Sequence, residues 1–201
     1  FEDVCADPPS EEACPPTSTA IVHGPNRTYT QYTFGNLYNI NSGQLLGVEQ
    51  GYETGTAPNI VLNPLRTVQN EYVSDADMAF VIFPDTAGYT SWSGNDVLQR
   101  AALRPLKKTT TTQDGVSFTW KVNSTCNGNN TFCFDKRARP LNVTKSSALN
   151  YSKTEATTYP DNTTKWVLGQ VGKVTCMASV PIHPNCDGGI PYSVQSETIY
   201  D

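Results

Sequence analysis

Cysteines are the residues of this 201-residue chain whose spacing most directly predicts covalent chemistry. They form three close pairs, Cys5 with Cys14, Cys126 with Cys133, and Cys176 with Cys186. Each pair brackets a short segment containing Pro, Gly or Asn, which lets the chain turn back and bring two Cα atoms to bridging distance. The sequence alone leaves other pairings open, including a long-range link such as Cys14 to Cys186. We predict three local disulfides.

Metal-binding and catalytic residues have much weaker support in the sequence. The tight Cys-x2-Cys or Cys-His spacing of a zinc site is missing, although His183 lies near a cysteine. The other histidine, His23, is equally isolated, and no Gly-x-Ser-x-Gly nucleophile elbow occurs. We interpret a loose acidic group at Asp75, Asp77 and Asp85 as solvated strand ends rather than as a glycosidase pair. The sequence therefore predicts no metal, no cofactor and no enzymatic activity.

Six N-glycosylation sequons indicate the compartment in which the protein works. Their asparagines are Asn26, Asn123, Asn129, Asn142, Asn150 and Asn162. Chance gives about three sequons in a chain of this composition, so an Asn/Thr-rich loop region is the alternative interpretation. Together with the disulfides, the sequons predict a secreted, extracellular, eukaryotic glycoprotein whose signal peptide has already been removed. Five of them lie between residues 123 and 164, a segment that must face solvent if they are used.

Composition excludes two classes of partner and favours β-structure. The net charge is −5, only 16% of residues are charged, and no basic run is longer than two residues, so nucleic acid binding is not expected. The longest apolar run, Met78–Phe83, is far too short for a membrane span. Thr, Ser and Asn together account for 55 of the 201 residues, and this composition favours strands and turns over long helices.

The chain is predicted to have an extended Pro/Glu-rich arm at residues 1–20 and a single all-β domain at residues 21–201. From residue 29 onward, short apolar or Thr-rich stretches are interrupted every 8 to 12 residues by Gly, Pro, Asn or Asp. Five such stretches are strand candidates of four to six residues: Tyr29–Phe34, Leu37–Ile40, Gln44–Val48, Asn59–Leu62 and Ala79–Phe83. The segment Asp96–Leu106 is compatible with a two-turn helix or with two short strands.

Aromatic residues suggest a repeated unit. Phe80, Trp120 and Trp166 lie in three strand-like stretches that are 40 and 46 residues apart, which indicates threefold pseudosymmetry. The run Leu37–Val48, followed by Thr56–Leu62, resembles a repeat of the ricin-type β-trefoil lectins. This resemblance implies a β-trefoil, and a β-sandwich is the alternative all-β fold.

The same resemblance implies that the family's sugar sites are degraded in this chain. Gly47 stands where the family places its sugar-holding Asp. The family's Gln-x-Trp signature is reduced to Met78-Ala79-Phe80, Phe118-Thr119-Trp120 and Thr164-Lys165-Trp166. A trefoil scaffold without the ancestral sugar sites is therefore expected.

The best ligand-contact candidates are Trp92 and Tyr89, which lie in a polar, loop-like stretch. We interpret the basic groups at 100–108 and 136–139 as solvated faces, and Lys136–Arg139 as a loop exposed to trypsin-like proteases. The predicted function is non-enzymatic binding to a glycan or an extracellular protein surface. The alternatives are a structural subunit of a self-associating extracellular assembly and a protease inhibitor. Glycans over residues 123–164 would leave residues 1–115 for the partner.

Overall fold

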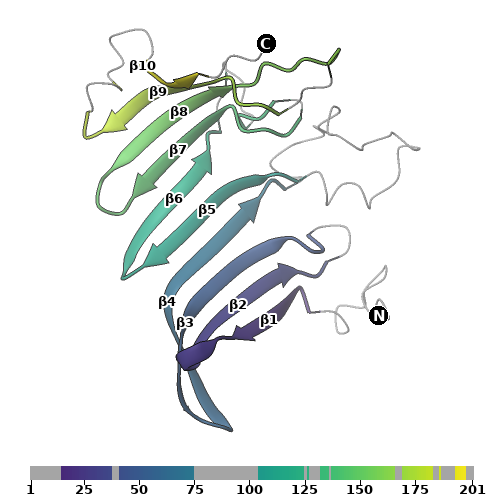
Figure 1. Ribbon diagram of the computed structural model, residues 1–201, viewed down its shortest axis with the longest axis vertical. Helices are drawn as coiled ribbons and strands as arrows, with labels where there is room; N and C mark the ends of the chain where they lie inside the picture. Colours follow the sequence, from purple (N-terminus) through teal and green to yellow (C-terminus); the bar gives the residue numbers. More distant parts are fainter. Residues whose placement is uncertain are drawn as a thin grey trace. The chain divides into compact units, whose positions relative to one another are not determined.

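Antiparallel strands make up nearly all the regular structure in the computed structural model of the protein (Figure 1). The structure describes residues 15–37, 41–74, 104–124, 126, 132–135, 137–165, 169–182, 186 and 193–197. Across these residues the one non-strand element is η1, a turn of 3-10 helix at Pro25–Arg27. The all-β class is thus confirmed. The segment with the helix-or-strand ambiguity lies outside the described residues except for its last three, of which Leu106 begins a strand.

The chain divides into two compact units, residues 1–74 with 88–117 and residues 75–87 with 118–201. Unit 1 contains β1 (Thr17–His23), β2 (Thr28–Gly35), β3 (Leu45–Thr56), β4 (Asn59–Tyr72) and β5 (Leu106–Gln113). The remaining strands are β6 (Val116–Val122), β7 (Asn142–Ser147), β8 (Ser152–Thr158), β9 (Lys173–Val180) and β10 (Ser193–Glu197). Within each unit the strands are hydrogen bonded in their chain order, as an antiparallel meander.

The first strand of unit 1 begins inside the segment that the sequence assigned to an extended arm. β1 pairs with β2 over its whole length, from Thr17 opposite Gly35 to His23 opposite Tyr29. Thr17–Ala20 therefore belong to the sheet, because their β-branched and small side chains suit an edge strand as well as an extended arm. Tyr29 and Val73 are the most deeply buried side chains described in this unit.

Strands β3 and β4 are much longer than the four- to six-residue strands expected from the sequence. They have 12 and 14 residues, and Gly51 and Pro64, residue types that usually interrupt a strand, lie inside them. The two residues face each other at a β-bulge, where the register shifts between Gln50 and Gly51. A Cβ on Gly51 would lie 2.0 Å from the carbonyl oxygen of Asn63, so only glycine fits this close approach.

Unit 2 has a small core that lies beside a disulfide. Val122, Val143 and Cys133 are buried together, and partly buried Trp120 and Leu141 are among the side chains packed against them. Cys133 is bonded to Cys126, and a second disulfide links Cys176 to Cys186. These are two of the three local pairs predicted from the spacing. Cys5 and Cys14 lie outside the described residues.

The specific β-trefoil arrangement is not confirmed. In the described part of the chain, these strand pairs join strands that are consecutive in the sequence, whereas a trefoil also needs three repeats arranged around an axis. Trp120 does lie in a strand, β6, as expected. The other two repeat markers, Phe80 and Trp166, lie outside the described residues. No helix among the described residues is long and apolar enough to cross a membrane.

Candidate functional site

Several residues predicted to do chemistry fall outside the described part of the chain. They are the contact candidates Tyr89 and Trp92, the sequon residue Asn129, His183, and the acidic residues Asp75, Asp77 and Asp85. These predictions therefore stay untested. Three other features of the described residues could carry function: a two-stranded ribbon, an edge strand and a cluster of ion pairs.

The ribbon is the part of the β3–β4 hairpin that extends beyond its neighbours in unit 1. β2 pairs with β3 only as far as Tyr52, and β5 pairs with β4 only as far as Arg66. Residues 53–65, which we call the β3–β4 ribbon, therefore pair only with each other along the described strands. Figure 1 shows the two strands continuing past β2 and β5.

Aliphatic side chains are exposed along this ribbon. Ile60, Val61 and Leu65 have 47%, 56% and 56% of their surface accessible, and Tyr52 at the base has 43%. Val61 faces Thr54 and Ile60 faces Gly55, so the two aliphatic residues lie on opposite faces of the ribbon. Residues 54–65 contain no charged side chain. Each face of the ribbon thus presents an accessible aliphatic side chain, without charge between residues 54 and 65.

The ribbon is held in a defined direction by the turn between β1 and β2. His23 Nδ1 lies 2.5 Å from Oε1 of Glu53, and Arg27 donates to the carbonyl of Gly55 at 3.2 Å. Inside the ribbon, Asn63 donates from Nδ2 to Oγ1 of Thr54 at 3.0 Å. These polar contacts orient the hairpin without covering its aliphatic side chains.

Strand β1 is the second accessible feature of unit 1. All seven of its residues are exposed, including Ile21 and Val22 at 43% and 57%. Its pairing in the described chain is with β2 on one side. The strand contains no Lys, Pro, Asp or Glu, the residue types that usually protect a sheet edge from pairing with another chain.

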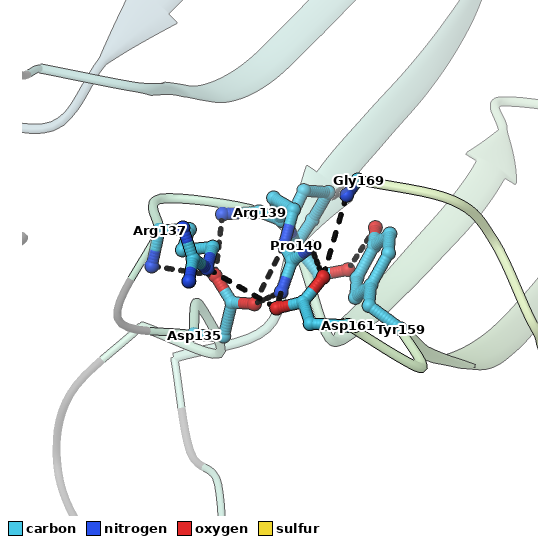
Figure 2. A network of polar contacts seen from close by, with 7 residues as sticks. All are labelled: Asp135, Arg137, Arg139, Pro140, Tyr159, Asp161 and Gly169. Carbon is cyan, nitrogen blue, oxygen red and sulfur yellow. Dashed lines mark hydrogen bonds and ion pairs between the residues drawn. The ribbon is translucent and has the colours of Figure 1, made fainter. Parts of the chain in front are cut away.

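The third feature is a cluster of ion pairs in unit 2, which we call the arginine–aspartate cluster (Figure 2). Arg139 donates to both carboxylate oxygens of Asp161, from Nη1 at 2.6 Å and from Nη2 at 2.8 Å. It also donates from Nε to Asp135 at 2.7 Å, and its Nη2 contacts the same carboxylate. Arg137 adds a bond from Nε to Asp161 at 3.1 Å. The two arginines thus link the loop after Phe134 to the loop after β8.

Backbone and aromatic groups complete this cluster. The other carboxylate oxygen of Asp135 accepts the backbone N–H groups of Arg137 and Arg139 at 2.9 and 3.0 Å. The ring of Tyr159 lies 4.3 Å from the guanidinium carbon of Arg139, a cation–π distance, and its hydroxyl donates to the carbonyl of Pro140. Figure 2 shows the guanidinium of Arg139 enclosed by the two carboxylates and this ring.

The electrostatics of the cluster fit a structural role. The hydrogen bonds from Arg139 lower the pKa of Asp161 to about 2, and the bonds to Asp161 and Asp135 raise the pKa of Arg139. Two arginines and two aspartates balance in charge, and the bonds between them occupy the donors that would bind a substrate anion. The prediction that these basic residues are a solvated, protease-exposed face is wrong, because the side chains of Arg137 and Arg139 are only 16% and 17% exposed.

The sequence does not predict this cluster, because its members are far apart in the chain. Arg139 and Asp161 are separated by 22 residues, and each residue alone is typical of a polar loop. A local signal was present for one half of it: Asp135 precedes the two arginines by two and four residues, as in turns where an Asp side chain accepts backbone N–H groups.

A further carboxylate, Glu155, is also neutralised by basic side chains. Its oxygens lie 2.6 Å from Nζ of Lys145 and 2.8 Å from Nζ of Lys153. Burial alone raises the pKa of Glu155, but the hydrogen bonds from the two lysines outweigh it and lower the pKa. In unit 1, burial and the bond to Glu49 raise the pKa of Tyr29 to about 12. These groups are stable in one protonation state near pH 7 rather than set to exchange protons.

The described sequon asparagines fall into two groups. Asn26, Asn150 and Asn162 are exposed, whereas Asn123 and Asn142 are half-buried. Among the described residues, no group of three or more His, Cys, Asp or Glu side chains is arranged to hold a metal ion.

Known proteins offer no further guide to this site. A scan against protein-family models, a search of curated proteins and a search of solved structures each found no match. The function therefore has to be argued from the geometry of the chain itself.

Proposed function

We propose that the protein is a secreted, N-glycosylated, non-enzymatic subunit that associates with further copies of itself in an extracellular assembly. The β3–β4 ribbon carries this proposal, because it presents aliphatic side chains on two faces beyond the edge of its sheet. A two-stranded hairpin is marginally stable in water unless something packs against it. The two disulfides support a secretory location.

A second copy is the partner that fits the charge distribution best. The chain carries a net charge of −5, so two copies repel each other except where the contacting surfaces are uncharged. The ribbon residues 54–65 and strand β1 up to Val22 are such surfaces. Fully burying a Val, Leu or Ile side chain is worth about 1.5–3 kcal/mol, so half-exposed side chains gain roughly half of that each.

Strand β1 is suited to pairing with its own copy. An antiparallel β1–β1 pair centred on Ala20 sets Thr19 opposite Ile21, a β-branched pair without charge repulsion. Such a pair buries less than the 800 Å² or so per partner of a stable interface, so the ribbon has to contribute as well.

The non-enzymatic part of the proposal is supported by the state of the described carboxylates. Asp135, Asp161 and Glu155 are each engaged by arginine or lysine side chains. A general acid or base needs a pKa near the working pH, and the pKa of Asp161 and that of Glu155 are lowered instead.

The decisive experiment measures mass against concentration by size-exclusion chromatography with light scattering. We expect the wild-type chain to form dimers or larger species as its concentration rises. A variant with Ile60→Thr, Val61→Thr and Leu65→Thr keeps residues that favour strands but removes the aliphatic surface, and it should stay monomeric. The matched control is Phe118→Thr with Val180→Thr, which removes comparably exposed side chains from unit 2. A wild-type chain that is monomeric at every concentration refutes the proposal.

Carbohydrate binding remains a separate prediction that rests on the trefoil resemblance and on Trp92 and Tyr89. A glycan array tests it directly, with Trp92→Ala as the variant that should lose any retained glycan. The protease-inhibitor alternative loses one of its supports, because Arg137 and Arg139 are tied into ion pairs rather than presented to a protease. An inhibition panel with trypsin-like and cysteine proteases completes the comparison.

A further inference from the structure

Two of the predicted glycosylation asparagines bind each other in unit 2. Asn123 donates from Nδ2 to Oδ1 of Asn142 at 2.7 Å, and its backbone N–H donates to the Asn142 carbonyl at 3.0 Å. Thr144, the hydroxyl residue of the Asn142 sequon, donates from Oγ1 to Oδ1 of Asn123 at 2.8 Å. We call these three side chains the amide clasp.

The clasp extends to the next strand and is only partly accessible. The hydroxyls of Thr144 and Thr154 lie 3.0 Å apart, and since the Thr144 proton is donated to Asn123, Thr154 is the donor of this pair. Asn123, Asn142 and Thr144 are all half-buried. Both sequons thus have their amides in a hydrogen-bonded network that joins the end of β6 to β7 and β8.

The other three described sequons have a different geometry. Asn26 and Asn150 are exposed and lie in turns with φ of 56° and 63°, a left-handed conformation that asparagine tolerates. Asn162 is exposed too, and its Oδ1 accepts the backbone N–H of Lys165 at 2.9 Å. A glycan is attached to Nδ2, so this bond to Oδ1 is compatible with glycosylation of Asn162.

We propose that Asn26, Asn150 and Asn162 are the glycan acceptors among the described sequons, and that Asn123 and Asn142 stay unmodified as a structural clasp. This inference rests on the proposed function for its secretory compartment. A sugar on Asn123 would begin at the atom that lies 2.7 Å from the Asn142 amide. Asn142 is half-buried on the other side of the same contact, so a sugar added to either residue before folding has to be accommodated beside the side chain of the other.

The clasp changes which surface glycans cover. The five sequons between residues 123 and 164 predict glycans along that whole segment. With glycans at Asn150 and Asn162 but not at Asn123 and Asn142, neither the end of β6 nor the start of β7 carries a sugar.

Glycopeptide mapping of the full chain, produced and secreted by eukaryotic cells, tests this assignment. Enzymatic glycan removal in heavy-oxygen water marks each occupied asparagine as a labelled aspartate. We expect the label at Asn26, Asn150 and Asn162, and its absence at Asn123 and Asn142. Ser152→Ala and Thr164→Val should each remove the mass of one glycan, because each destroys one exposed sequon.

The variant Asn142→Leu distinguishes a structural role from an unused sequon. It should leave the glycan mass unchanged and lower the melting temperature by about 5 °C, because it removes a side-chain acceptor from the network. Thr164→Val, which destroys an exposed sequon and keeps the bond from Lys165 to Asn162, is the matched control and should remove one glycan without that loss of stability. A folded, secreted protein with a glycan at Asn123 or Asn142 overturns the clasp assignment but leaves the secretory proposal intact. A chain that is not secreted, or is secreted without any glycan, refutes both.

Discussion

The two units of the molecule differ in what holds them together. The described residues of unit 1 are held together by backbone hydrogen bonds along long paired strands. Tyr29 and Val73 are its deeply buried side chains. Unit 2 has a buried cluster around Val122 and Cys133, two disulfides and the arginine–aspartate cluster. The difference teaches that disulfides and ion pairs between loops stabilise unit 2, whereas long paired strands stabilise unit 1.

The largest effect we expect comes from removing a disulfide of unit 2. In Cys126→Ala with Cys133→Ala, the lost chain constraint alone costs about 2.5 kcal/mol, and a fully buried side chain is truncated as well. Hydrogen exchange measured on peptides should show faster exchange in β7 and β8, with β2 and β3 unchanged. Equal acceleration in both units would show that their stabilities are not separate.

The second effect concerns the arginine–aspartate cluster. Arg139→Gln removes the paired bonds to Asp161 and leaves two partly buried carboxylates with less compensation, which we expect to cost about 2 kcal/mol. Denaturant unfolding measures the loss. Lys121→Gln, at an exposed lysine of β6, is the control and should change stability by less than about 0.5 kcal/mol. If the two variants lose equal stability, the cluster is a surface feature without structural weight.

Local patterns predicted the parts of the fold that depend on near neighbours. The stretch Tyr29–Phe34 lies within β2, and Phe118–Val122 lies within β6, because alternation along one strand is encoded in consecutive residues. The pairs Cys126–Cys133 and Cys176–Cys186 are likewise local. In each case the signal and its partner lie within about ten residues.

What the sequence did not predict depends on distant partners. Gly51 and Pro64 are read as strand breaks in isolation, and only their pairing across a bulge makes them part of a long hairpin. The exposed ribbon follows from where β2 and β5 stop, which a single strand does not encode. Asn123 and Asn142 both match the sequon pattern in the sequence, but the hydrogen bond between them forms only in the folded sheet.

A third, smaller effect distinguishes two glycines of unit 1. Gly55 and Gly115 have φ of 84° and 75°, so alanine is strained at both, by about 1 kcal/mol. At Gly115 an added Cβ meets nothing within 4 Å, whereas at Gly55 it would lie 2.1 Å from the carbonyl oxygen of Asn59. We expect Gly115→Ala to lose about 1 kcal/mol in denaturant unfolding and Gly55→Ala to lose more. Gly55→Ala should also weaken self-association, because the ribbon turn has to shift. Equal losses would show that the ribbon yields to the added atom without cost.

The smallest effect is confined to acid and is again specific to unit 2. The pKa of Asp161 is about 2 in the folded protein, below the value near 3.9 of an unfolded aspartate. Because the folded pKa is the lower one, the stabilisation is fully present above pH 4 and is lost as the pH falls from about 4 to 2. Thermal unfolding of the wild type and of Asp161→Asn, measured from pH 7 to pH 2, should give two curves that differ at pH 7 and converge toward pH 2. Arg139 stays charged throughout this range, so convergence reports the protonation of its carboxylate partners. A difference that stays constant down to pH 2 would mean that Asp161 stabilises the loops by its shape rather than by its charge.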